Sequence, residues 1–296
     1  MQKTFGLVRF FPFLDGFFRW AVPKFLDFSS YPYLKGKIAK LEFERNLSYQ
    51  YIQNKSQMDL YHLKILNILS TKNSSYGEMV RLGSPNDGGY VIPNIIQIKS
   101  PWITIGLGFN TSFENDLILL GTSVNSFDHT IAYRPRNLHK SVKWHKIGFG
   151  ESEELDLLNL KDIITKSQIN SEFSWNLKFD IENAEWDLLP EILKLKDENK
   201  LPIVIVSELH QMIWNGSNEF KANLLNELSV EYFPVAVHGN NYSPLFVSAN
   251  YTIYDAIEVT WLRKDFLNQL NLNYASGDIL FNPNDPNSKN FKMGIG

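Results

Sequence analysis

The stretch WITIGLGFNTSFENDLILLGTSVNSFDHT, residues 102–130, decides the fold of this chain. It opens with an apolar run that ends in two glycines, Gly106 and Gly108. A segment with helical spacing follows, and a second apolar run ends in Asp128. A strand, a glycine turn, a helix and a second strand make up a nucleotide-binding βαβ unit. The stretch therefore predicts the start of a Rossmann-like α/β domain.

Short apolar runs and helix-like segments alternate from residue 101 onward. The seven runs are WITIG, SVNSFD, VKWHKIGF, NLKFDIE, PIVIVSEL, EYFPVAVH and AIEVTWL. Between them lie TSFENDLILLG, ESEELDLLNLKDIITKS, AEWDLLPEILKLK and SNEFKANLLNELS. This alternation predicts a seven-stranded, mostly parallel sheet with helices on both faces. Residues 239–254 carry no helix pattern, so we expect the last strand to be antiparallel to its neighbour.

The first 75 residues differ in composition, and we expect an accessory segment there, followed by a catalytic domain over residues 76–296. Residues 5–28, FGLVRFFPFLDGFFRWAVPKFLDF, hold eight of the 21 phenylalanines, and charged residues interrupt them. They therefore do not form the apolar region of a secretory signal. We expect this segment to pack on the catalytic domain or on another subunit; the alternative is peripheral contact with a membrane. Apolar residues at helical spacing predict a helix over residues 37–70.

Composition narrows the class of partner. The 296 residues carry a net charge of −3, which gives no basic excess for a nucleic-acid backbone. The absence of cysteine excludes disulfides and thiolate zinc sites. No apolar stretch reaches the ~20 residues that a membrane-spanning helix needs. We expect a cytoplasmic protein, membrane-associated at most peripherally, and the helix over residues 37–70 offers a surface for a homo-oligomer.

The glycine turn suits a ligand that approaches the main chain closely. Thr111 and Glu114 have the spacing of a capping box, which places a helix N-terminus beside the turn. Asp128, at the end of the second strand, can accept the hydroxyl hydrogens of a ribose. A dinucleotide site has a third glycine near position 111, and a Walker pattern is missing from the sequence. S-adenosylmethionine, an adenosine ligand without a pyrophosphate, fits better; the alternative is a turn with a purely geometric role.

The same motifs are similar to those of a known family. WITIGLGFNTSFE, LKFDIENAEWDLL, SELH, HGNN and EVTWL resemble FkbM-like class I methyltransferases, and RLGSPNDGGYVI resembles a stretch that often precedes that domain. The resemblance covers residues 78–264. It implies a class I methyltransferase fold and methyl transfer from S-adenosylmethionine, usually to an oxygen. It also implies a saccharide hydroxyl, on a glycan or glycolipid, as the acceptor.

Residue by residue, the resemblance implies a cofactor site and an acidic signature. Gly106 and Gly108 match the family's cofactor turn, and Asp128 matches its ribose-binding acid. The acidic signature within LKFDIENAEWDLL corresponds to Asp180, Glu182 and Glu185.

Two positions depart from the family pattern. Thr104 stands where many class I enzymes have an acid that meets the amino end of the cofactor. Glu114 or Asp180 is expected to replace that acid. Asn183 stands where the family has glycine, and asparagine tolerates left-handed backbone geometry.

An alcohol acceptor needs a base, or a metal that lowers its pKa. Polar residues at the carboxyl ends of the predicted strands are the candidates, because ligands of α/β sheets bind there. His210 is the first candidate for the general base, His238 is the second, and Asp180 is expected at the boundary between cofactor and acceptor. A hydrogen-bonded structural role is the alternative for His210.

Metal assistance is a separate hypothesis. Asp180, Glu182, Glu208 and His210 offer oxygen and imidazole ligands that would suit a divalent ion. A compact metal motif such as HExxH is missing from the sequence. We therefore assign no metal from the sequence.

Other interpretations stay open at this point. RLGSPNDGGYVI predicts a hairpin, which is either plain or a lid that turns Arg81, Asp87 or Tyr90 toward the cofactor. An NAD-dependent oxidoreductase and a non-catalytic Rossmann-like binding module are the competing functions, because a fold alone decides no function.

Overall fold

The computed structural model of the chain describes residues 32–70, 78–151, 156–169, 174–213, 219–269, 282–289, 291 and 293–295. The chain divides into two units, residues 1–49 and 50–296. The site described below lies in the larger unit. The predicted boundary between residues 75 and 76 differs from this division and stays a prediction. The expectation for the aromatic residues 5–28 falls outside the described residues.

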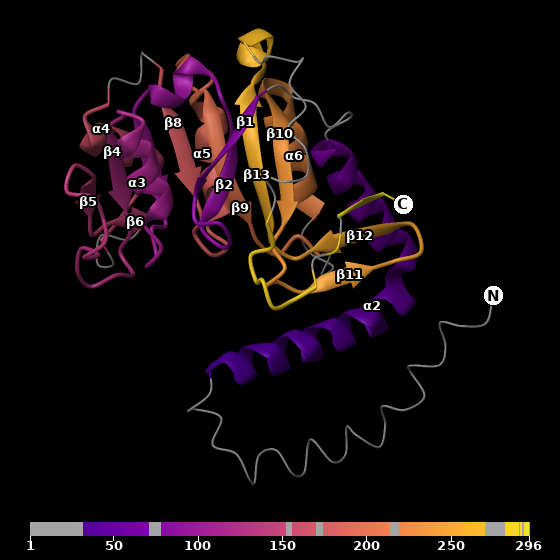
Figure 1. The fold of residues 1–296 in the computed structure, drawn as a ribbon. Helices are drawn as coiled ribbons and strands as arrows, with labels where there is room; N and C mark the ends of the chain where they lie inside the picture. Colours follow the sequence, from indigo (N-terminus) through magenta and orange to yellow (C-terminus); the bar gives the residue numbers. More distant parts are fainter. Residues whose placement is uncertain are drawn as a thin grey trace. The chain divides into compact units, whose positions relative to one another are not determined.

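A mostly parallel sheet forms the centre of the larger unit (Figure 1). Within the described residues it has seven strands, in the order β10 (Tyr232–Gly239), β13 (Ile257–Arg263), β9 (Val204–Leu209), β8 (Asn176–Phe179), β3 (Trp102–Ile105), β4 (Val124–Phe127) and β5 (Lys143–His145). Strand β13 runs antiparallel to both β9 and β10, and the other pairings are parallel. All seven predicted strands and the antiparallel direction of the last one are thus confirmed.

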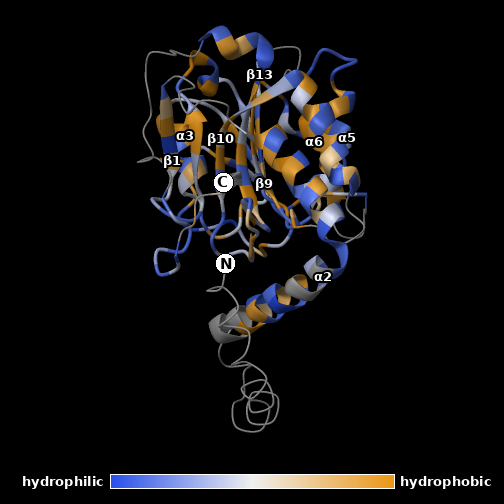
Figure 2. Ribbon diagram, turned by 90° about the vertical axis from the view of Figure 1, so that its right-hand side faces the viewer, coloured by the Kyte–Doolittle hydropathy of each residue, from blue (hydrophilic) through white to orange (hydrophobic). Residues whose placement is uncertain are grey.

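Helices and a hairpin cover the two faces of this sheet. Figure 2 shows α3 and β1 on one side of the strands and α5 and α6 on the other. The elements that cover the sheet are the hairpin of β1 (Met79–Gly83) and β2 (Gly89–Pro93), α3 (Ser112–Leu119), α4 (Leu160–Ser167), α5 (Glu185–Lys194) and α6 (Glu219–Glu231). Because both faces are covered, the inner strands are buried at every residue rather than alternating between buried and exposed.

Two details differ from the sequence pattern. The helix expected over residues 151–167 begins only at Leu160, after a short parallel pair of β6 (Gly148–Phe149) and β7 (Leu157–Leu158). Its start is fixed by Asn159, whose side chain accepts a hydrogen bond from the main-chain N–H of Asp162 at 2.9 Å.

Residues 239–254, expected to lack a helix, carry a second hairpin of β11 (Leu245–Val247) and β12 (Tyr251–Tyr254). Strand β12 also pairs with β14 (Gly294–Ile295). Short 3-10 helices lie at Ile96–Lys99 and Lys264–Gln269.

The predicted helix over residues 37–70 is confirmed as α2 (Pro32–Leu69), with one non-helical residue, Asn54, at φ −125°. From residue 50 onward α2 belongs to the larger unit, where it packs on the β11–β12 hairpin. The His62 Nδ1 atom lies 3.0 Å from the Tyr251 hydroxyl, and that hydroxyl donates to Asp59 at 2.8 Å. No helix in the described part of the chain combines the length and the apolar character needed to cross a membrane.

Candidate functional site

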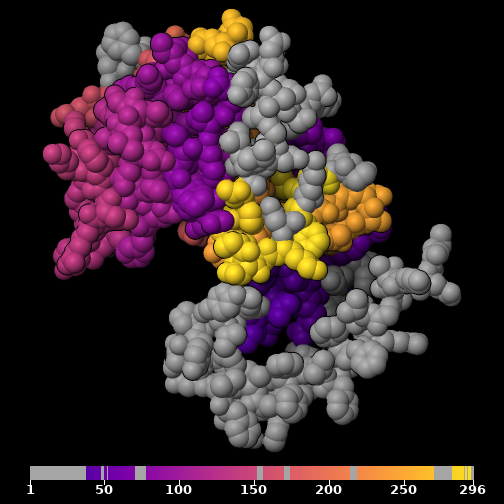
Figure 3. Space-filling model, in the orientation of Figure 1, coloured from indigo at the N-terminus to yellow at the C-terminus, as the bar shows by residue number. Residues whose placement is uncertain are grey.

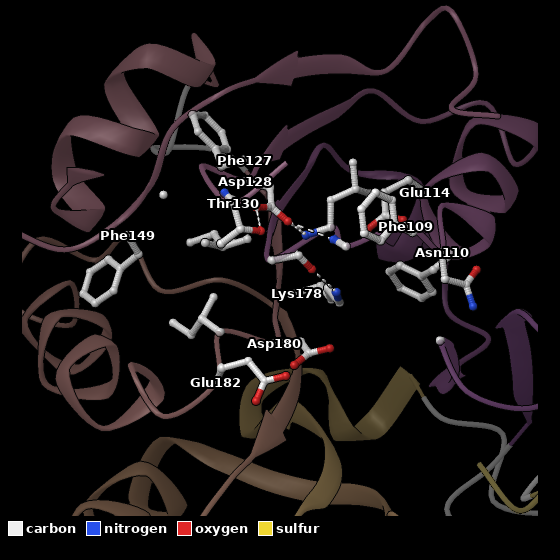
Figure 4. A pocket seen from close by; sticks show the side chains of 18 of the residues that line it. Phe109, Asn110, Glu114, Phe127, Asp128, Thr130, Phe149, Lys178, Asp180 and Glu182 are labelled. Atoms are coloured by element: carbon white, nitrogen blue, oxygen red, sulfur yellow. Dashed lines mark hydrogen bonds between the residues drawn. The ribbon is translucent and has the colours of Figure 1, made fainter. Parts of the chain in front are cut away.

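A cavity of about 490 Å³ opens at the carboxyl ends of β3, β4 and β8. This volume falls within the usual range for small-molecule sites. The loop after β3, the end of β4, the turn of the β1–β2 hairpin and the loop after β8 form its walls. Figure 4 shows the side chains around it, with Phe149 on one side, Asp128 and Lys178 in the middle and Glu114 on the other.

The glycine turn forms one wall of the cavity, and its two glycines have different structural roles. Both have positive φ, +81° for Gly106 and +59° for Gly108. A Cβ atom on Gly106 would lie 1.7 Å from the carbonyl oxygen of Asp180, so this glycine lets β3 approach the end of β8. A Cβ atom on Gly108 would meet no heavy atom within 4 Å. Gly108 therefore leaves the main chain open toward a ligand.

Asp128, the predicted ribose acid, lies in the cavity wall beside this turn. Its Oδ2 atom accepts from the N–H groups of Leu107 and Gly108 at 3.0 and 2.8 Å. Its Oδ1 atom accepts from the N–H and the hydroxyl of Thr130 at 2.8 and 2.6 Å. Burial raises the pKa of Asp128, but these hydrogen bonds outweigh it and the pKa is lowered. A ribose would share or displace one of these donors, since a carboxylate offers about four acceptor positions.

The predicted capping box at Thr111 and Glu114 is wrong. Within the described residues the Thr111 side chain makes no capping hydrogen bond; Asn110 Oδ1 accepts instead from the N–H and hydroxyl of Ser112, at 3.2 and 2.6 Å. Thr111 is buried, and its hydroxyl accepts from the side-chain amide of Asn115 at 3.3 Å.

Glu114 faces the cavity rather than the start of the helix. Its side chain is buried, and its Oε1 atom meets no hydrogen-bond donor in the described part of the chain. Burial raises the pKa of Glu114, and the positive charge of Lys178 opposes the rise. An unsatisfied buried carboxylate oxygen needs a donor, and a cavity beside it lets a ligand supply one.

Lys178 stands in the quoted stretch LKFDIENAEWDLL, but the sequence analysis assigned it no contact with a ligand. Its Nζ atom donates to the carbonyl oxygen of Gly106 at 2.6 Å and lies 5.5 Å from the centre of the Tyr90 ring. The side chain is buried and lines the cavity. The signal was a lysine inside the apolar strand NLKF, since an ammonium group is almost never fully buried without partners.

The acidic signature and the fifth strand converge, as the sequence predicted, at the edge of the cavity. His210 Nδ1 lies 2.8 Å from Glu185 Oε1, while Nε2 lies 3.6 Å from Glu182 Oε2 and 3.8 Å from Glu208 Oε1. Burial lowers the pKa of His210, but the hydrogen bond and charge of Glu185 and the other acids raise it to about 9. His210 thus holds a proton at neutral pH in this arrangement, which opposes its action as an unassisted general base.

The loop after β8 has left-handed backbone geometry at two consecutive residues. Glu182 has φ +53° and Asn183 has φ +90°. The expectation that asparagine replaces glycine at a left-handed position is confirmed. The turn brings the exposed carboxylate of Glu182 to the edge of the cavity, near His210.

Behind this loop lies a buried carboxylate pair. Glu208 of β9 and Glu258 of β13 stand opposite each other in register. Each accepts one hydrogen bond from a side-chain amide, Asn240 to Glu208 at 2.7 Å and Asn284 to Glu258 at 2.6 Å. Burial raises the pKa of both groups, to about 8 for Glu258. The sequence analysis missed Glu258, whose signal was an acid inside the apolar run AIEVTWL.

His238, the second candidate base, lies opposite Glu258 in the pairing of β10 with β13. Burial, and to a smaller extent the charge of Arg81, lowers its pKa to about 4. His238 is therefore neutral at neutral pH. It lies outside the cavity lining, which the loops after β3, β4 and β8 dominate.

The predicted hairpin over RLGSPNDGGYVI is confirmed, and its turn lines the cavity through Asp87, Gly88 and Tyr90. The Arg81 guanidinium donates to the carbonyl of Ser84 at 3.0 Å, which stabilises the turn. The Asn86 side chain donates to the carbonyl of Pro283 at 2.8 Å, and Figure 3 shows the yellow C-terminal residues beside this region.

Comparison with known proteins adds no assignment: no family model matches the chain, and no curated protein sequence matches it. The α/β architecture by itself leaves the chemistry open. The geometry of the cavity is therefore the basis for a function.

Proposed function

We propose that this chain is an S-adenosylmethionine-dependent O-methyltransferase with a class I methyltransferase fold. The antiparallel strand β13, inserted between β9 and β10, agrees with what the resemblance to FkbM-like enzymes implies for the sheet. The resemblance also supports a saccharide hydroxyl, on a glycan or glycolipid, as the acceptor.

One observation carries the proposal: the walls of a single cavity hold two carboxylates, one fully hydrogen-bonded and one with an oxygen that lacks a donor. Asp128 is ionised and lies beside the open main chain of Gly108, where it suits ribose hydroxyls. Glu114 has a buried oxygen without a donor, and the ammonium of Lys178 lies in the same cavity. A carboxylate and an ammonium together match the two charges of an amino-acid group.

The cavity can accommodate S-adenosylmethionine on this basis. Asp128 would hold the ribose, and Glu114 and Lys178 would hold the amino and carboxylate groups of the methionine part. Phe149 and Phe127 line the same cavity and offer apolar surface for the adenine. The bound cofactor supplies an electrophilic methyl group.

The chain's own residues then have to place an acceptor hydroxyl in line with that methyl group, with the reacting atoms at ~3–3.5 Å. Asp180 lies in the cavity next to the buried pair of Glu208 and Glu258 and raises the pKa of both. Carboxyl groups accept hydrogen bonds from hydroxyls, so this region suits the acceptor.

The test is calorimetry of S-adenosylmethionine, its demethylated product, adenosine and NAD, each on the wild-type chain and on Glu114→Gln. The wild type should bind the first three and not NAD. Glu114→Gln should bind both methionine-containing ligands about 10–100-fold more weakly, because a charged hydrogen bond contributes about 1.5–3 kcal/mol. Adenosine binding should not change.

Asp187→Asn provides the matched control, because it removes one carboxylate at the exposed start of α5. It should leave every affinity unchanged. Binding of NAD alone would favour the oxidoreductase. Cofactor binding without methyl transfer to any member of a glycan panel would favour the non-catalytic module.

A further inference from the structure

We propose that Asp180, Glu182 and His210 bind a divalent metal ion at the edge of the cavity. One ligand atom from each of these side chains lies within 4.8 Å of the others. Two of the three residues, Asp180 and Glu182, line the cavity itself. The existence of this ion site is independent of the proposed methyl transfer; only the role given to the ion below rests on that function.

The orientation of His210 is the first reason. Glu185 is fully buried and its Oε1 atom accepts from both His210 Nδ1, at 2.8 Å, and the N–H of Ile181, at 3.2 Å. This contact fixes the ring and turns Nε2 toward Glu182 and Glu208. A carboxylate behind one nitrogen of a histidine whose other nitrogen binds the ion is the usual arrangement at metal sites.

The spacing around Nε2 is the second reason. The distances of 3.6 Å to Glu182 Oε2 and 3.8 Å to Glu208 Oε1 are too long for hydrogen bonds. Two ligand atoms bound to one ion at ~2.1 Å lie roughly 3.0–3.6 Å apart for ordinary bond angles. His210 Nε2 and Glu182 Oε2 therefore already have a spacing that one ion can bridge, while the full set with Asp180, within 4.8 Å, has to contract around the ion.

Charge is the third reason. Four carboxylates surround this imidazole: Asp180, Glu182, Glu185 and Glu208. The second oxygen of Glu185 is buried and meets no donor among the described residues. The buried ammonium groups of Lys178 and Lys221 donate to main-chain carbonyls instead. A dication bound at Nε2 would replace the proton of His210, which passes to solvent, and would add positive charge beside these acids.

The ligand set selects the kind of ion. Two carboxylates with one imidazole, and no sulfur, favour a hard ion such as Mg²⁺ or Mn²⁺. Where the proposed function holds, an ion here would polarise the acceptor hydroxyl and lower its pKa. His210 would then act as a ligand rather than as the general base.

The test is Mn²⁺ binding to the full chain, first stripped with EDTA, measured by electron paramagnetic resonance at neutral pH without cofactor or acceptor. We expect one Mn²⁺ per chain, displaced by excess Mg²⁺. Glu182→Gln should weaken Mn²⁺ binding at least tenfold, and His210→Gln should weaken it further. Asp187→Asn, which removes a nearby charge that is not a ligand, should change the affinity less than twofold.

Folding does not confuse this result, because the Glu182 side chain is 83% exposed and its replacement removes no buried contact. No binding to the wild type would overturn the proposal. An equal weakening of Mn²⁺ binding by Glu182→Gln and Asp187→Asn would also overturn it, since that result indicates attraction by the overall negative charge rather than a specific site.

Calorimetry of S-adenosylmethionine on the stripped chain separates this proposal from the proposed function. Mn²⁺ binding without S-adenosylmethionine binding refutes the methyltransferase and leaves the ion site intact. S-adenosylmethionine binding without Mn²⁺ binding has the opposite meaning.

Discussion

Asp128, directly after β4, and Glu258, within β13, are buried acids of one domain whose pKa values are shifted in opposite directions. Asp128 accepts four hydrogen bonds, which lower its pKa in spite of burial. For Glu258 the one hydrogen bond described comes from the neutral amide of Asn284, and burial raises its pKa to about 8. The acceptor positions of Asp128 are thus occupied without a ligand, whereas most of those of Glu258 are not occupied by the donors described.

The difference extends to the regions around them. The glycine-turn region is held by main-chain N–H groups, so its shape exists before a ligand arrives. The acidic region of Glu208, Glu258 and His210 gathers buried carboxyl groups with few donors, and burial raises the pKa of both glutamates. Preorganisation favours tight ligand binding, whereas strongly shifted pKa values in buried carboxyl groups mark a candidate functional site.

The largest effect should come from the glycine turn. Gly106→Ala places a Cβ atom 1.7 Å from the Asp180 carbonyl at a positive φ, so β3 and β8 must separate. We expect the free energy of unfolding to fall by at least about 4 kcal/mol in urea titrations. Gly108→Ala keeps a similar backbone geometry in open space and should cost only about 1–2 kcal/mol. Equal losses of stability in the two variants would show that the main chain around Gly106 can shift to admit a Cβ atom.

The sheet could be predicted from the sequence because its inner strands are buried on both faces, so each appears as a short, mostly apolar run. The meeting of Asp180, Glu185 and His210 was also predictable, since the carboxyl ends of parallel strands share one edge. Left-handed geometry at Asn183 agrees with the resemblance, which places this asparagine at a glycine position, and with the tolerance of asparagine for such geometry.

Three features could not be predicted, for reasons of packing. Lys178 and Glu258 stand within apolar strands, and only the pairing of neighbouring strands decides where such side chains point. The capping box failed because Asn110, one residue earlier, already caps the helix, which frees Glu114 to face the cavity. A short sequence pattern does not show which of two neighbouring polar residues caps the helix and which one packs in the core.

The opposite pKa shifts predict opposite responses to pH. The pKa of Glu258 is about 8 in the folded state against 4.5 for an exposed group, so the folded state binds the extra proton between these values. Stability should therefore fall as pH rises from about 4.5 to 8, by roughly 1 kcal/mol per unit from this group. Glu258→Gln should remove that slope in urea titrations.

Asp128 provides the control with the reverse sign. Its folded pKa is lowered, so its contribution is present above the unfolded pKa and is lost as pH falls through the folded pKa. Asp128→Asn should lower stability at neutral pH and flatten only the acid limb. If Glu258→Gln leaves the slope of stability against pH unchanged between pH 4.5 and 8, the pKa of Glu258 is not raised and the two acids do not have opposite shifts.

The smallest expected effect tests how Asp128, which already accepts four hydrogen bonds, can still bind a ligand. The Thr130 hydroxyl donates to Asp128 Oδ1 at 2.6 Å, and it is the only side-chain donor among the four groups described at this carboxylate. Thr130→Val removes it while the three N–H donors stay, so we expect a loss of about 1 kcal/mol of stability. If a ribose hydroxyl takes the place of this donor, calorimetry should show adenosine binding that is a few-fold tighter in Thr130→Val, because nothing has to be displaced. Weaker adenosine binding would mean that Thr130 orients Asp128 for the ligand, and the preorganisation of the glycine-turn region would then extend to this side chain.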